Sequence, residues 1–226
     1  MNRLTFLLTV PVFALMISSC GVSTAEHIDV DSKPLVLPQN AVAKPKIVAF
    51  GDSLTAGFGL EENESYPYLL QQKLNAEGFN YEVVNAGVSG DTSRGGVERI
   101  DWTLQGDNVQ ILILALGAND MLRGLPPAKM KENLDRIIQK AKAKNIKVLL
   151  CGMLAPPAMG AAYSRDFSHV FPDLAEKHKI AYLPFLLENV ALQRDLNQAD
   201  GIHPNEKGTR IMTDNIYRAL QPMLTK

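Results

Sequence analysis

The sequence predicts an α/β domain in which helices cover both faces of a parallel β-sheet. From Lys46 to the C-terminus, short runs that are almost entirely apolar alternate with longer amphipathic segments. Central strands of a parallel sheet are continuous apolar runs, and regular strand–helix alternation is typical of such sheets. The chain has 226 residues, 46% of them hydrophobic, which is enough for one sizeable core.

Five apolar runs are expected to form the strands, each covered on both faces. In chain order they are residues 46–50, 81–87, 109–116, 145–152 and 180–186. Helices are expected at residues 65–78, 92–105, 126–144, 164–179 and 205–224. The third shows the pattern most clearly, because Met130, Leu134, Ile137 and Ile138 follow the i, i+4, i+7, i+8 spacing of one helix face.

The N-terminus has a different composition from the domain. Residues 4–17 are uncharged and largely apolar, too short for a comfortable membrane span, and they suit a secretory signal peptide over residues 1–19. A short membrane anchor is the alternative. The following "ISSC" resembles a bacterial lipobox, in which Cys20 would be lipidated, and Gly21 after it favours outer-membrane sorting. Residues 20–45 contain three prolines and no sustained periodicity, so we expect a tether that leads to the domain at 46–226.

Charge and cysteine content exclude several classes of protein. The formal net charge of -1 provides no basic footprint for nucleic acid. The chain has two cysteines, Cys20 and Cys151, so a lipidated Cys20 would leave no disulfide partner. Cys151 lies in an apolar run and is expected to be a buried core residue. Oligomeric state has no readable signal.

Polar clusters follow four of the predicted strands. Ser53 follows the first strand, Gly90 the second, Asn119 the third, and Asp200 with His203 the last. Ligands of parallel α/β sheets bind outside the carboxyl ends of the strands, so these residues are expected at one edge.

These residue types suit nucleophilic catalysis. A serine nucleophile needs a base to take its proton, and that base needs an acceptor on its other nitrogen. Asp200 and His203, three residues apart on one turn, are expected to supply both for Ser53. The backbone N–H groups of Ser53 and Gly90 and the amide of Asn119 are candidates for an oxyanion hole.

Four blocks of sequence, in order, resemble the SGNH, or GDSL, hydrolase family. They are "GDSLTAG" (51–57), "GVSGDTS" (87–93), "GAND" (117–120) and "DGIHPN" (200–205). The resemblance implies a flavodoxin-like three-layer sandwich with strand order 2-1-3-4-5, and hydrolysis of esters or thioesters without metal or cofactor. The chain is similar to the bacterial periplasmic thioesterase, lysophospholipase and arylesterase branch of this family. Together with the lipobox-like "ISSC", this leads us to expect a lipid-anchored, periplasm-facing enzyme of the cell envelope.

Several residues have competing interpretations. Asp52 and Asp120, beside the catalytic candidates, are interpreted as structural acceptors for loop N–H groups. Arg94 and Arg123 are interpreted as surface charges, with contact to an anionic headgroup of the substrate as the alternative. His169 and His178 lie in a helical pattern and lack the preceding aspartate that marks His203.

Substrate and activity also have alternatives. The loop at 153–164 is apolar and Pro-rich. In enzymes of the family that the chain resembles, this region borders the acyl pocket, so the resemblance implies a medium to long acyl chain of a lysophospholipid or thioester. Carbohydrate O-deacetylation and a non-catalytic surface-binding lipoprotein remain alternatives. A metallophosphoesterase is disfavoured, because such sites need several converging His and carboxylate ligands.

Overall fold

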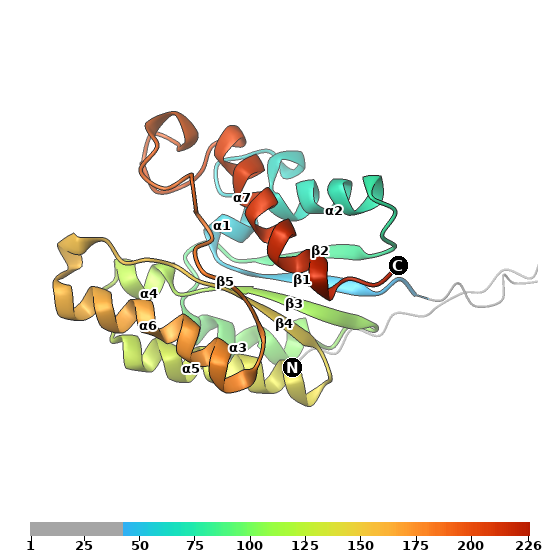
Figure 1. Cartoon of the computed structure of the whole chain (residues 1–226), viewed down its shortest axis with the longest axis horizontal. Coiled ribbons are helices and arrows are strands. Elements are labelled where there is room, and N and C mark those ends of the chain that lie inside the picture. Colours follow the sequence, from blue (N-terminus) through green and yellow to red (C-terminus); the bar gives the residue numbers. More distant parts are fainter. Residues whose placement is uncertain (1–42) are drawn as a thin grey trace, which may run out of the picture. The chain divides into compact units, whose positions relative to one another are not determined.

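The protein contains one five-stranded parallel sheet. The computed structural model describes residues 43–226. Its strand order is β2-β1-β3-β4-β5, and every neighbouring pair is parallel (Figure 1). The strands are β1 (Lys46–Gly51), β2 (Glu82–Gly87), β3 (Val109–Ala115), β4 (Lys147–Cys151) and β5 (Ala181–Leu183). The predicted fold class and strand order are confirmed.

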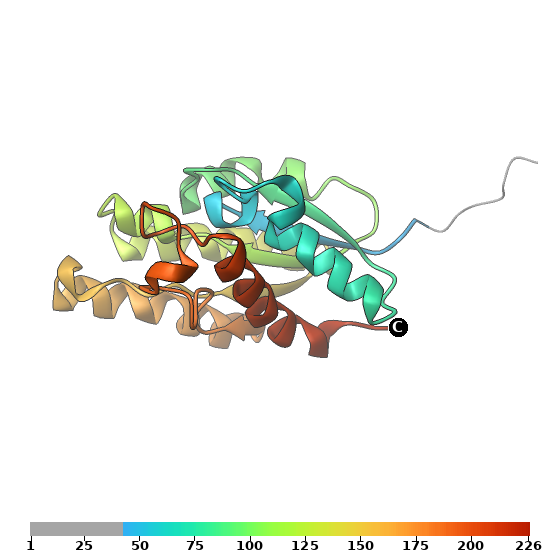
Figure 2. The same ribbon diagram turned by 90° about the horizontal axis from the view of Figure 1, so that it is seen from above.

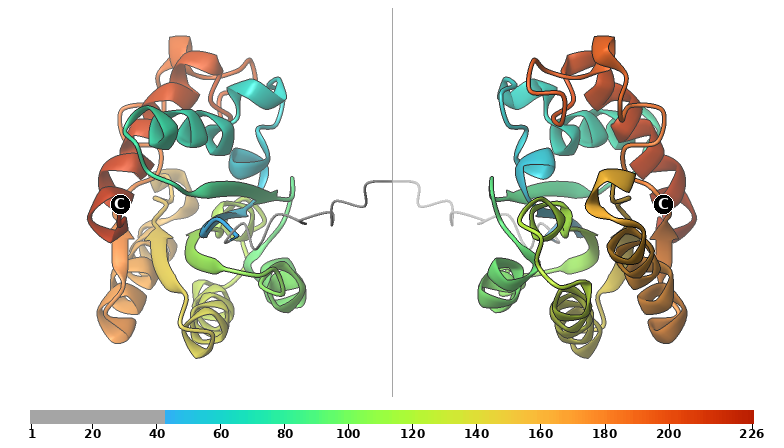
Figure 3. Two further views of the ribbon diagram at one scale, coloured as in Figure 1. Left: turned by 90° about the vertical axis from the view of Figure 1, so that its right-hand side faces the viewer. Right: turned by 90° about the vertical axis from the view of Figure 1, so that its left-hand side faces the viewer.

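Helices cover both faces of this sheet. The α-helices are α1 (Ser53–Ala56), α2 (Tyr66–Ala76), α3 (Ser93–Thr103), α4 (Ala118–Leu122), α5 (Pro127–Ala143), α6 (Ala161–His178) and α7 (Glu206–Leu220). Short 3-10 helices are η1 (Glu62–Glu64), η2 (Pro157–Met159), η3 (Arg194–Leu196) and η4 (Gln221–Met223). Helices α2 and α7 lie side by side on one face, while α3, α5 and α6 cover the other (Figures 2 and 3).

The strand order places a crevice beside the end of β1. The chain moves outward from β1 to β2 and then returns past β1 to β3. Because crossovers between parallel strands are right-handed, this reversal sends α2 and α3 to opposite faces. The loops that leave β1 and β3 therefore diverge, and the carboxyl ends of these two strands form the usual binding position of a doubly wound sheet.

Burial differs between central and edge strands. In β1, β3 and β4 most residues are buried, as expected for apolar runs inside a parallel sheet. The expectation that all five strands are covered on both faces is wrong for β2 and β5. Both lie at the edges of the sheet, where no further strand shields them, and no residue of β2 is fully buried.

Two short helices were not predicted from the sequence. Helices α1 and α4 have 4 and 5 residues, too few to show a helical period. Helix α6 begins at Ala161, three residues before the predicted start. Within residues 43–226, no helix has the length and apolarity needed to span a membrane. The predicted signal peptide, Cys20 and nearly all of the predicted tether lie outside the described residues.

Candidate active site

Ser53 lies at the point where β1 ends and α1 begins. It is the first residue of α1, and the side chain of Asp52 caps the helix by accepting a hydrogen bond from the Leu54 N–H at 3.1 Å. Gly57 ends the helix in the left-handed region, and its N–H donates to the Ser53 carbonyl. A single helical turn, capped at both ends, thus holds Ser53 at the carboxyl edge of the sheet.

The structure brings Ser53, His203 and Asp200 together. His203 Nε2 lies 2.9 Å from Ser53 Oγ, and His203 Nδ1 lies 2.6 Å from Asp200 Oδ2. The other carboxylate oxygen of Asp200 accepts from the N–H groups of Ile202 and His203, at 3.0 and 3.1 Å. The His203 ring and these two N–H groups lower the pKa of Asp200 to about 2, so it is ionised at neutral pH.

Two residues that lie outside the four sequence blocks, Phe58 and Gln198, support His203. The Phe58 ring packs against the imidazole, with ring centroids 4.7 Å apart. The Gln198 side-chain amide donates to the carbonyls of Phe58 and Pro204, and the Gln198 N–H donates to the His203 carbonyl. Gln198 therefore ties the histidine loop to the loop that follows α1, although the two segments are far apart in sequence.

The three oxyanion-hole candidates, Ser53, Gly90 and Asn119, all line one pocket. The N–H groups of Leu54, Thr55 and Ala56 all donate to Asp52, which leaves the Ser53 N–H as the free donor among the described first-turn contacts of α1. The Asn119 amide nitrogen donates to the Asp91 carbonyl at 3.0 Å and lies 3.4 Å from a carboxylate oxygen of Asp52. The second contact is long for a hydrogen bond, so one N–H of Asn119 has only a weak partner.

Two glycines have backbone conformations that shape this side of the site. Gly90 has a φ of 81°, in the region that favours glycine, and its carbonyl accepts from Arg123 Nη2 at 2.7 Å. Arg123 is exposed, as predicted, but its contact with Gly90 has no signal in the sequence. Gly117 has a φ of 123°, and a Cβ there would lie 2.8 Å from Met130 Sδ. This tight turn between β3 and α4 places Asn119.

Asp52 and Asp120 both accept hydrogen bonds from backbone N–H groups, as expected. Both are 2% exposed. Asp120 accepts from the N–H and hydroxyl of Ser93 at 2.7 and 2.6 Å, which joins α4 to the start of α3. Asp52 accepts from Leu54, yet burial outweighs that contact and raises its pKa to about 6.

The raised pKa of Asp52 predicts a pH-dependent loss of stability. Between its ordinary value of 3.8 and about 6, folded protein retains a proton that unfolded protein has released. The stabilisation from this protonated carboxyl is fully present below the ordinary pKa of 3.8. It is lost as pH rises through the folded-state pKa of about 6. In Asp52→Asn, whose amide oxygen still accepts from Leu54, this loss disappears. We expect the free energy of unfolding of the variant, minus that of wild type, to rise by about 2 kcal/mol between about pH 4.5 and about pH 8. Urea unfolding measures it, and a pH-independent difference would contradict the prediction.

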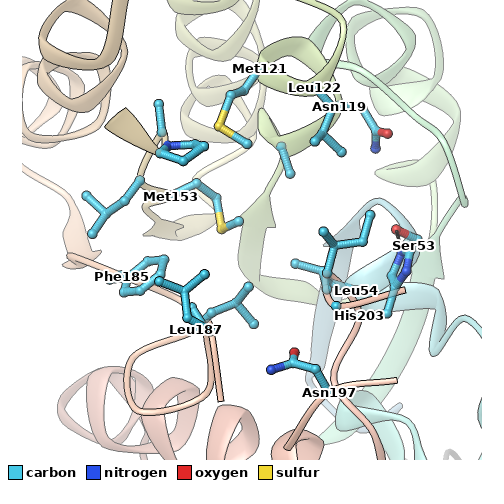
Figure 4. A pocket seen from close by; sticks show the side chains of 18 of the residues that line it. Ser53, Leu54, Asn119, Met121, Leu122, Met153, Phe185, Leu187, Asn197 and His203 are labelled. Atoms are coloured by element: carbon cyan, nitrogen blue, oxygen red, sulfur yellow. Dashed lines mark hydrogen bonds between the residues drawn. The ribbon is translucent and has the colours of Figure 1, made fainter. Parts of the chain in front are cut away.

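An apolar pocket of about 620 Å³ opens beside Ser53 and His203. In Figure 4, Ser53 and His203 lie on one side of it, and Met153, Phe185 and Leu187 lie on the other. Further apolar lining comes from α4, from the loop after β4 and from the segment before η3: Met121, Leu122, Leu154, Ala155, Pro156, Pro157, Ala191 and Leu192. The loop after β4 therefore lines the pocket, as the family resemblance implied.

The remaining reactive groups lie apart from this site. Cys151 is completely buried, as predicted, and burial raises its thiol pKa to about 12. His169 and His178 lie on α6, where His178 contacts Asp135. Arg94 is exposed and pairs with Glu98 on α3. Within residues 43–226, no three His, Cys, Asp or Glu side chains converge as metal ligands would.

Comparisons with known proteins agree with these observations. A model of the GDSL-like lipase/acylhydrolase family matches residues 49–211. The chain is 40% identical over 190 residues to esterase TesA of Pseudomonas aeruginosa, covering 84% of this chain and 94% of that protein. It is 35% identical to thioesterase 1/protease 1/lysophospholipase L1 of Escherichia coli, covering 84% and 90%.

A solved structure agrees as well. The psychrotrophic esterase EstA from Pseudoalteromonas sp., in a form inhibited by monoethylphosphonate, is 34% identical with a TM-score of 0.76, covering 80% of this chain and 98% of that one. The family match spans most of the domain, and the relatives are covered almost completely. The chain therefore belongs to the GDSL-like lipase/acylhydrolase family and is an ester hydrolase.

Proposed function

We propose that this ester hydrolase acts through Ser53 as nucleophile, His203 as general base and acid, and Asp200 as the group that orients His203. The observation that carries the proposal is the continuous chain of contacts from Asp200 to His203 Nδ1 and from His203 Nε2 to Ser53 Oγ, at the mouth of the apolar pocket. An acceptor on Nδ1 holds the imidazole in the tautomer whose Nε2 can take a proton.

The reaction proceeds in two halves. Ser53 Oγ bonds to the acyl carbonyl carbon while His203 takes the hydroxyl proton, and His203 then donates that proton to the departing alcohol or thiol. Water next attacks the acyl-enzyme, with His203 taking its proton and returning it to Ser53, which releases the acid. The N–H groups of Ser53 and Gly90 and the Asn119 amide stabilise the oxyanion in both halves. The phosphonate-inhibited form of the related EstA supports a nucleophile of this kind.

The substrate that we propose carries a medium to long acyl chain. Most of the pocket lining is apolar, and the walls opposite Ser53 are formed by side chains such as Met153 and Phe185. Such a pocket favours each additional buried methylene by roughly 0.8 kcal/mol. The names of the relatives, thioesterase and lysophospholipase, are compatible with an acyl chain joined to different leaving groups.

Acyl chain length is the property that tests this substrate class. We expect kcat/KM on p-nitrophenyl esters to rise at least about 10-fold from acetyl to octanoyl, because two or more additional methylenes would be buried. Because the leaving group is constant in this series, the comparison isolates the acyl pocket. Highest activity on the acetyl ester would contradict the proposal and favour the carbohydrate O-deacetylase.

The leaving group requires a second comparison at fixed chain length. An octanoyl thioester, an octanoyl aryl ester and a lysophosphatidylcholine should all be hydrolysed, because the proposed mechanism uses only the carbonyl and one proton for the leaving group. Hydrolysis of none of them by folded protein would favour the non-catalytic surface-binding lipoprotein.

We also propose that the enzyme is a lipoprotein of the bacterial cell envelope. The support is the sequence alone: a short apolar segment followed by "ISSC", with Cys20 as the lipidation site. Lipidation through Cys20 would hold the domain at a membrane, facing the periplasm, and Gly21 directly after Cys20 favours the outer membrane. Metabolic labelling with a fatty-acid analogue, lost in Cys20→Ser, supports this location; equal labelling of both forms overturns it.

A further inference from the structure

We propose that Arg99 is a positioning residue for the oxyanion side of the active site. The inference rests on the proposed function, because it concerns the donors assigned there to the oxyanion. Arg99 lies on α3 and was not singled out from the sequence. Its guanidinium donates hydrogen bonds near the carboxyl ends of β1 and β2 and to the side chain of Asp91. The main-chain carbonyl of Asp91 accepts a hydrogen bond from the Asn119 amide.

The guanidinium makes three directed hydrogen bonds. Nε donates to Asp91 Oδ2 at 2.7 Å, Nη1 to the Ala86 carbonyl at 2.8 Å, and Nη2 to the Gly51 carbonyl at 2.9 Å. Arginine can make such contacts in several fixed directions at once because its guanidinium is planar. A lysine ammonium, a single point on a flexible stem, cannot reproduce them.

Each acceptor belongs to a segment that carries part of the site. Gly51 ends β1 and precedes Asp52 and Ser53, while Ala86 lies near the end of β2, just before the loop that contains Gly90. Asp91 provides the main-chain carbonyl to which Asn119 Nδ2 donates at 3.0 Å. One cation thus fixes the relative positions of the segments that present all three proposed oxyanion donors.

The surroundings of the ion pair restrict its movement. The Arg99 side chain is 20% exposed and that of Asp91 is 12% exposed. The guanidinium also stacks over the Phe50 ring, 3.8 Å from its centroid. On the other side, a Cβ at Gly95 would lie 1.8 Å from Asp91 Oδ1, so the carboxylate packs directly against the backbone of α3. Removing the cation leaves a largely buried carboxylate without its partner, and Asp91 must then shift.

Such a shift affects the rate more than binding of the substrate. A displacement on the order of 1 Å in a catalytic group can cost about 100-fold in rate. In the proposed function, the substrate is bound mainly through its acyl chain in the apolar pocket, and Arg99 does not line that pocket. We therefore expect Arg99→Ala to lower kcat about 10- to 100-fold and to change KM less than about 3-fold. Arg99→Lys should recover only part of the loss.

All rates are expressed per active site titrated with a fluorophosphonate, so misfolded molecules do not count. With rates expressed in this way, three further readouts separate positioning from general stabilisation. The second-order rate of phosphonylation should fall with kcat, because both reactions develop charge on an oxygen in the same hole. The pH profile of kcat should keep its shape, because the contacts among Asp200, His203 and Ser53 are unchanged. Millimolar guanidinium should partly restore Arg99→Ala, since it can occupy the vacated space.

The matched control is Arg94→Ala, on the same helix. The Arg94 side chain is 82% exposed and pairs with Glu98, so its loss should leave all of these rates unchanged. The proposal is overturned if Arg99→Ala, per titrated site, reacts as fast as Arg94→Ala, or if only its melting temperature falls. If Arg99→Ala yields no folded protein, the same rate measurements on Arg99→Lys, compared with Arg94→Ala, decide the question. Failure of the proposed function is distinct, because wild type itself would then not be phosphonylated at Ser53.

Discussion

Ser53→Ala is expected to lower kcat by roughly 10⁴- to 10⁶-fold, the loss typical of removing the nucleophile from a serine–histidine pair. The hydroxyl lies 2.9 Å from His203 Nε2, and alanine leaves the imidazole without a proton to accept. The remaining rate would come from water activated in the same site. Hydrolysis of a p-nitrophenyl ester under saturating substrate measures the loss, and fluorophosphonate labelling of the same samples should disappear.

The variant should fold normally. Asp52, rather than the Ser53 side chain, caps α1, and the hydroxyl contacts only His203 among the described hydrogen bonds. The free energy of unfolding should therefore change by less than about 1 kcal/mol. Ser168→Ala is a matched control, since that hydroxyl only bonds the preceding turn of α6. Phosphonylation of Ser53→Ala at the wild-type rate would show that another residue is the nucleophile.

The position of the site followed from local features of the sequence. Apolar runs identified β1 and β3, and polar residues directly after them identified the edge where a ligand binds. Asp200 and His203 could be paired because they are three residues apart on one turn. The sheet topology brings the two parts of the site together. The carboxyl ends of parallel strands lie at one edge, so Ser53 lies beside His203 although they are 150 residues apart in sequence.

The contacts that hold these residues could not be predicted in the same way. Arg99 and Gln198 each bond segments that are distant in sequence, and neither has a local pattern that distinguishes it from a surface residue. The pKa of Asp52 depends on burial by residues from other elements, so "GDS" alone reveals nothing about it. Edge strands were misjudged for a similar reason: Val83 and Val84 of β2 are as apolar as central residues, but the edge position of β2 leaves them only half-buried.

His203→Ala should cost as much as the loss of Ser53, again roughly 10⁴- to 10⁶-fold in kcat. Without the imidazole, the serine proton has no acceptor in the first step and the leaving group has no donor. Asp200→Asn should cost less, roughly 10²- to 10⁴-fold, because Asp200 acts only through the histidine and its side chain is 39% exposed. Phosphonylation rates of both variants should follow the same order as kcat. His169→Ala, an exposed histidine on α6, is the control that should retain full activity.

The double variant decides whether Ser53 and His203 act as one unit. Independent contributions would multiply, so Ser53→Ala with His203→Ala would lose roughly the product of the two single losses. A nucleophile and its base make a single proton transfer together, and removing either one already abolishes it. We therefore expect the double variant to be no slower than the slower single variant, within about 3-fold. Multiplicative losses would mean that His203 contributes in some other way, for instance by packing against Phe58 at the pocket mouth. In that case Phe58→Ala should reproduce most of the loss in kcat caused by His203→Ala. If the contact chain from Asp200 to Ser53 carries the proton instead, Phe58→Ala should lower kcat only slightly.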